Sequence, residues 1–165
     1  MNNFSQEVYD RLGVLEEMEN QFNNNNLEYF DKLAFHHDHV IRTRAICIIA
    51  EIGGNKAVKT ISKVLEKDSD ELVRHEAAFS LGQLGFASGI KSLTYALKND
   101  SSIFVRHEAA VALGVIGSED ARITLIEALN DSSEEVKKSA IVALANLDYI
   151  FKSKKRNQFT RLTGG

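Results

Sequence analysis

The feature that most constrains the fold of this 165-residue chain is an internal repeat of about 32 residues. Two segments, VRHEAAFSLGQLG from Val73 and VRHEAAVALGVIG from Val105, are identical at nine of thirteen positions. More divergent copies begin at Ile41 (IRTRAICIIAEIG) and Val136 (VKKSAIVALANLD), so successive starts lie 32, 32 and 31 residues apart. Such a period is typical of folds in which each repeat is one supersecondary unit stacked on its neighbours.

Each repeat is predicted to form two antiparallel helices. In the second repeat, apolar residues recur at spacings of three and four before a polar turn: Val58, Ile61, Val64 and Leu65. Gly53, Gly85 and Gly117 end the same run in three repeats, a place where glycine commonly terminates a helix. The chain contains no proline, which favours uninterrupted helices. The sequence therefore predicts an all-α fold, an α-solenoid of about four helical hairpins.

Two segments flank the repeats. Residues 1–26 are expected to form an N-terminal capping helix and an asparagine-rich turn, because apolar residues recur along one helical face: Val8, Leu12, Leu15, Met18 and Phe22. Residues 27–151 hold the repeat domain. Residues 152–165 carry five basic residues and no acidic residue, a composition that predicts a flexible basic tail.

Charge and hydropathy exclude several classes of function. Residues 1–151 carry 15 Lys and Arg residues against all 23 Asp and Glu residues, so we expect no nucleic-acid binding. No segment approaches the roughly 20 apolar residues of a membrane span, and the polar start lacks the pattern of a secretory signal. We therefore expect a soluble, cytoplasmic protein without a membrane partner. Its single cysteine, Cys47, is expected to be a small buried core residue.

The dipeptide His-Glu occupies the same place in the two central repeats, as His75-Glu76 and His107-Glu108. The outer repeats carry other dipeptides at this place: Thr43-Arg44 and Lys138-Ser139. The fold therefore does not require His-Glu there. Because equivalent positions of successive second helices line up along one surface of a helical solenoid, His75 and His107 are predicted to be neighbours.

Two imidazoles and a carboxylate are the ligand set that holds non-haem Fe(II) with positions left open, although zinc accepts the same ligand types. Small residues follow each histidine on the same side of the helix, among them Gly82 and Gly114. A glycine inside a helix costs about 1 kcal/mol relative to alanine. Either a neighbouring helix approaches closely at these glycines, or they leave room for a metal and a substrate.

These motifs resemble the deoxyhypusine hydroxylase family, HEAT-repeat di-iron monooxygenases built from two similar halves of four repeats. The resemblance covers one half, from about Ile41 to Ile150, including HEAAFSLGQLG, VRHEAAVALGVIG and the flanking repeats without His-Glu. HEAT-like repeats of the phycobilin-lyase type share the general pattern VRxxAAxALGxIG, so the His-Glu pairs alone make the match specific.

The resemblance implies a role for each of the four residues. His75 and His107 would bind one iron, and Glu76 would reach the iron held by the facing half. Glu108 would serve as the catalytic carboxylate beside a substrate amine, as the counter-charge of a protein-borne or polyamine-like cation. Because the second half is missing, a homodimer would replace it, with two irons per dimer and one per chain.

Three other interpretations stay open. The chain could be a small non-enzymatic HEAT-repeat adaptor for protein-protein interaction, with Arg74, His75 and Glu76 forming a solvated polar edge. It could also be a bilin-lyase-like chaperone of a chromophore. A separate cluster, His36, His37 and His39, is expected to lie in a solvated turn or to bind a metal adventitiously.

Overall fold

Helices follow one another in pairs along the chain, in a computed structural model that describes residues 6–155. Nine α-helices span these residues: α1 (Gln6–Asn23), α2 (Leu27–Leu33), α3 (His39–Gly53), α4 (Ala57–Lys67), α5 (Glu71–Leu84), α6 (Ile90–Asn99), α7 (Ile103–Ile116), α8 (Arg122–Ala128) and α9 (Glu134–Lys155). Short 3₁₀ turns precede three of the first helices of a pair: Gly54–Lys56, Ala87–Gly89 and Glu119–Ala121. The described residues contain no strand, so the predicted all-α fold is confirmed.

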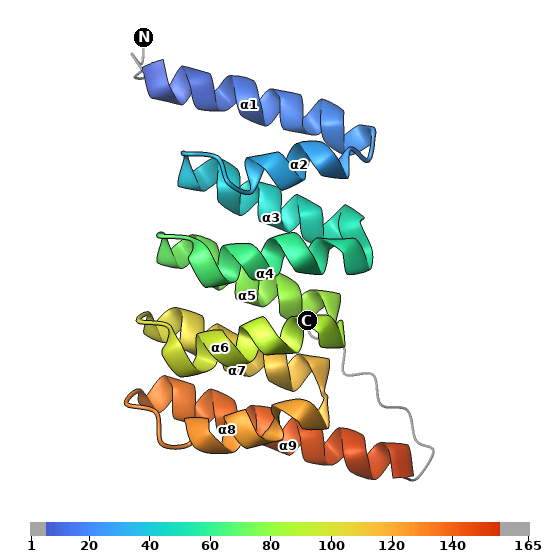
Figure 1. Cartoon of the computed structure of the whole chain (residues 1–165), viewed down its shortest axis with the longest axis vertical. Helices are drawn as coiled ribbons and strands as arrows, with labels where there is room; N and C mark the ends of the chain where they lie inside the picture. The colour runs from blue at the N-terminus through green and yellow to red at the C-terminus, as the bar shows by residue number, and fades with distance from the viewer. Residues whose placement is uncertain (1–5, 156–165) are drawn as a thin grey trace.

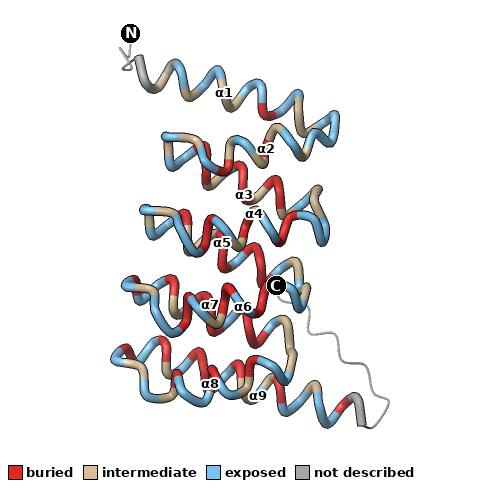
Figure 2. Tube along the Cα trace, in the orientation of Figure 1, coloured by how far each residue is buried: buried red, intermediate tan, exposed pale blue. Residues whose placement is uncertain are grey.

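The four predicted hairpins are α2–α3, α4–α5, α6–α7 and α8–α9, stacked one on another (Figure 1). The second helices α3, α5, α7 and α9 pack against each other in chain order, as do the first helices α4, α6 and α8. Buried residues lie mostly on α3 to α9, whereas α1 and the loops are mostly exposed or partly exposed (Figure 2). The architecture is the predicted α-solenoid.

Each second helix buries one stripe of apolar residues against the first-helix layer. In α5 these are Val73, Ala77 and Leu81, none of them more than 1% exposed. His75 stands two residues after Val73, about 200° around the helix, and therefore lies on the opposite side. The periodicity that buries the core thus also sets the His-Glu position on the outer face of the second-helix layer.

The glycines inside the second helices allow close helix packing. A Cβ atom on Gly82 would lie 2.9 Å from the Cβ atom of Ala112, and one on Gly114 would lie 2.7 Å from that of Ala143. Both distances are shorter than a tolerable carbon-carbon contact, so α5, α7 and α9 could not approach this closely with larger residues. Of the two predicted reasons for these glycines, the structure shows the close approach of a helix.

The expected glycines lie at the ends of all three helices, but only two of them have the left-handed conformation. Gly85 and Gly117 follow α5 and α7 with φ values of 69° and 67°, a conformation that only glycine adopts without strain. Gly53 is the last residue of α3, and Gly54 after it has the positive φ of 50°. Gly53 is small for another reason, since its Cβ would meet that of Ala57 at 2.9 Å.

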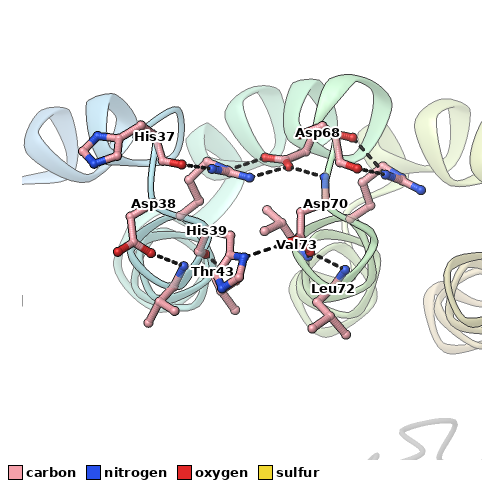
Figure 3. A network of polar contacts seen from close by, with 12 residues as sticks. His37, Asp38, His39, Thr43, Asp68, Asp70, Leu72 and Val73 are labelled. Carbon is pink, nitrogen blue, oxygen red and sulfur yellow. Dashed lines mark hydrogen bonds and ion pairs between the residues drawn. The ribbon is translucent and has the colours of Figure 1, made fainter. Parts of the chain in front are cut away.

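A ladder of arginine-aspartate pairs joins successive repeats. The members are Arg42–Asp68, Arg74–Asp100 and Arg106–Asp131, with Nε–Oδ2 distances of 2.7, 2.7 and 2.8 Å. Asp68 connects two rungs, because its carboxylate accepts from Arg42 while its backbone carbonyl accepts from Arg74 (Figure 3). The Arg74 side chain is 13% exposed, so the interpretation that placed it on a solvated edge is wrong.

The two ends of the described chain extend the solenoid. The N-terminal helix α1 packs against α2 and α3, with Met18 buried and Arg11 Nε 2.6 Å from Asp38 Oδ2. At the other end, α9 runs to Lys155, four residues past the expected end of the repeat domain. The rest of the expected basic tail, 156–165, lies outside the described residues. Among the residues that are described, no helix is long and apolar enough to span a membrane.

Removing one rung of the ladder should destabilise the fold. Arg74→Met leaves Asp100, whose side chain is only 7% exposed, as a buried charge without its guanidinium. We expect the free energy of unfolding in urea to fall by about 2–4 kcal/mol.

Arg122→Met is the matched control. Its partners Glu119 and Asp148 have side chains 50% and 54% exposed, so the expected loss is about 1 kcal/mol or less. Equal losses in the two variants would contradict a structural role for the ladder.

Candidate functional site

The two His-Glu pairs lie on adjacent, packed helices in the same register. His75 and Glu76 belong to α5, and His107 and Glu108 belong to α7. Each histidine stands five residues after the residue that precedes its helix, Asp70 for α5 and Ser102 for α7. The backbone N–H groups of Leu72 and Val73 donate to Asp70, which fixes the start of α5 (Figure 3). The shared offset brings the pairs side by side.

A contact across the helix interface connects the pairs. His75 Nε2 lies 3.5 Å from Glu108 Oε2, with side chains 37% and 11% exposed. Burial raises the pKa of Glu108, while the nearby imidazoles of His75 and His107 act in the opposite direction and the Glu76 carboxylate raises it further. Glu108 therefore interacts electrostatically with the other three residues, and these four residues are called the His-Glu cluster below.

His107 contacts the next repeat. Its Nδ1 atom lies 2.7 Å from Oγ of Ser139 on α9, and this hydroxyl also lies 2.9 Å from the backbone carbonyl of Glu135. Ser139 stands where the central repeats have glutamate. The sequence does not predict this contact, because the repeat register pairs His107 with the equivalent residue Lys138 and not with the residue after it.

Glu76 points toward the preceding repeat. Its Oε1 atom accepts hydrogen bonds from the thiol of Cys47 at 3.2 Å and from the hydroxyl of Ser80 at 3.5 Å. Burial, and then the hydrogen bond with Glu76, raises the pKa of Cys47 to about 12, so the thiol stays protonated at neutral pH. Cys47 is only half-buried, so the expectation that it belongs to the core is wrong.

An open cleft of about 440 Å³ adjoins Glu76 between α3 and α5. Its lining includes polar and apolar side chains of both helices: Cys47, Ala50, Glu51, Glu76, Phe79, Ser80, Gln83 and Leu84. Along the same helix positions, partly exposed apolar side chains continue from Phe79 to Val111 and Val142. This row, Phe79, Val111 and Val142, is here called the apolar row.

One chain does not assemble a complete metal site within residues 6–155, because no three His, Cys, Asp or Glu side chains there are grouped to hold a metal ion. This includes His36 and His37, which precede α3, and His39, which is the first residue of α3, so the expectation that all three lie in a turn is wrong for His39. His36 Nδ1 accepts the backbone N–H of Asp38, and His39 Nδ1 lies 3.0 Å from a carboxylate oxygen of Asp70. These imidazoles make contacts within and between the first repeats.

Comparison with known proteins defines the class of this chain. A family model described as HEAT repeats matches residues 58–145, more than half of the chain, so the protein belongs to the HEAT repeat family. Human deoxyhypusine hydroxylase, solved in complex with glycerol, is similar at a TM-score of 0.73 and 24% identity. The match covers 90% of this chain and 51% of that one, so this chain spans about half its length. A search of curated proteins found no match.

The burial of Glu108 predicts a pH dependence of stability in the metal-free protein. Because its folded-state pKa lies above the ordinary value of 4.5, the folded state binds the proton more tightly than the unfolded chain does. The stability contributed by Glu108 is fully present below that ordinary pKa and is lost as the pH rises through the folded pKa. In urea titrations, the free energy of unfolding should fall more with rising pH for the wild type than for Glu108→Gln.

Glu134→Gln is a control for which the opposite pH dependence of stability is expected. Lys137 lowers the pKa of the exposed Glu134 through a hydrogen bond and its charge, so the wild type should gain stability over this variant as the pH rises. Finding the same trend for both variants would show that Glu108 is not buried as described.

Proposed function

We propose that this chain is one half of a di-iron oxygenase that assembles as a homodimer. The observation that carries the proposal is the pair of in-register His-Glu dipeptides, adjacent on α5 and α7 and linked by the 3.5 Å contact between His75 and Glu108. The likeness of the fold to half of human deoxyhypusine hydroxylase supports it, since that enzyme is about twice as long.

The residues are of the types that bind iron, and a second copy of the chain would complete the set of ligands. His75 and His107 supply two imidazoles on neighbouring helices, and a carboxylate would complete the facial set typical of non-haem iron. In the proposed dimer this third ligand is Glu76 of the other copy. A two-fold axis would repeat the arrangement, giving two irons per dimer and one per chain.

The proposed reaction inserts one oxygen atom of dioxygen into a C–H bond of a protein-borne or polyamine-like amine. The other oxygen atom leaves as water, with two electrons and two protons from an external reductant. Iron, when bound, would supply the redox chemistry that activates dioxygen. Glu108 would bind the protonated amine through its carboxylate, and the cleft beside Glu76 would admit the substrate chain.

Iron content and molecular size test this proposal together. Protein purified without oxygen from iron-supplemented cells should contain about one iron per chain and elute as a dimer. His75→Ala should abolish the bound iron, because it removes one of two imidazoles. His39→Ala, at the start of α3 beside Asp70, should leave the iron content unchanged.

A non-enzymatic adaptor is the second candidate, and the apolar row favours it. Phe79, Val111 and Val142 are 40%, 36% and 68% exposed, a surface that a partner protein could bury. In that case the purified protein would be a metal-free monomer. His75→Ala would then change neither its metal content nor its binding of a partner.

A further inference from the structure

Ser139 contacts the His107 ring and can fix its orientation and tautomer. The two successive histidines make the same kind of inter-repeat contact, in which the third residue of one repeat meets the fourth residue of the next. His75 meets Glu108 in this way across α5 and α7, and His107 meets Ser139 across α7 and α9. The fourth repeat thus contributes to the His-Glu cluster although it has no His-Glu pair.

The direction of the hydrogen bonds follows from their partners. The Ser139 hydroxyl carries one proton and lies 2.9 Å from the Glu135 carbonyl oxygen, which can only accept. Such a bond from serine to the carbonyl four residues earlier is common in helices. The hydroxyl proton is therefore donated to Glu135, and the Ser139 oxygen accepts a hydrogen bond from Nδ1–H of His107 at 2.7 Å.

We propose that Ser139 is a positioning residue that holds neutral His107 as the Nδ1–H tautomer, leaving the lone pair on Nε2. Ser139 is 7% exposed, so water competes little for this bond. Histidines that bind metals characteristically donate their other ring N–H to a fixed acceptor, which orients the ring. The use of Nε2 as a metal ligand rests on the proposed function, whereas the tautomer depends on this chain alone.

His75 and His107 differ in the ring nitrogen that contacts the next repeat. His75 meets Glu108 through Nε2, whereas His107 is held through Nδ1 and keeps Nε2 out of that bond. His107 is therefore the imidazole already arranged to accept a metal in the metal-free protein. To bind a metal through Nε2, His75 would have to lose its contact with Glu108.

The tautomer can be measured by nitrogen NMR on the full-length, metal-free protein at about pH 8.5, where ordinary histidines are neutral. The signals of His107 are assigned from their loss in His107→Gln. In the wild type, Nδ1 of His107 should be protonated and Nε2 should not. Ser139→Ala should shift His107 toward the Nε2–H form, and Ser139→Thr, which keeps the hydroxyl, should retain the wild-type form.

A titration with Fe(II) under anaerobic conditions then measures the iron affinity of each variant. Ser139→Ala should weaken binding about 10–100-fold, and Ser139→Thr should bind within a few-fold of the wild type. An Nε2–H tautomer in the wild type, or an unchanged tautomer in Ser139→Ala, would overturn the role of Ser139. If the tautomer changes as expected but no variant binds iron, the role of Ser139 stands and the proposed function fails.

Discussion

The close packing of the second helices is the constraint on which the rest of this structure depends. Gly82 lies against Ala112 and Gly114 against Ala143, at distances that leave no space for a side chain on either glycine. This contact fixes the offset between successive repeats, since the helices can slide little without a clash. A fixed offset means that each position of one repeat always meets the same positions of the next.

Two sets of polar contacts follow from that offset: the arginine-aspartate ladder and the contacts of the two histidines. On one edge, each arginine at the second repeat position reaches the aspartate in the loop before the next second helix. On the outer face, the third position meets the fourth position of the following repeat, which joins His75 to Glu108 and His107 to Ser139. The ladder stabilises the stack, and the outer face holds groups whose chemistry the stack does not need. A functional cluster can therefore be placed on such a scaffold without changing its fold.

The sequence predicts the features that depend on its periodicity, which are the helical hairpins and their order. It does not predict the side-chain contacts that depend on the offset between repeats. The 32-residue period and the spacing of Val58, Ile61 and Val64 were sufficient for the hairpins, and the register of the dipeptides was sufficient to place the two His-Glu pairs at the same position of adjacent helices. The partner of Arg74 lies 26 residues away and that of Glu76, Cys47, lies 29 residues away, so both pairs exist only once the repeats are stacked. The sequence does not decide the role of Gly82 for the same reason, because Ala112, which it faces, belongs to another repeat.

The central claim is that each metal site takes its histidines from one copy and Glu76 from the other, and mixed dimers test it directly. One copy carries Glu76→Gln, and a differently tagged copy carries both His75→Ala and His107→Ala. Neither variant alone can form a complete site. Dimers purified through both tags should regain about one iron per dimer, because one intact pair of histidines then faces one intact Glu76. Mixed dimers that remain free of iron would contradict a site shared between two copies.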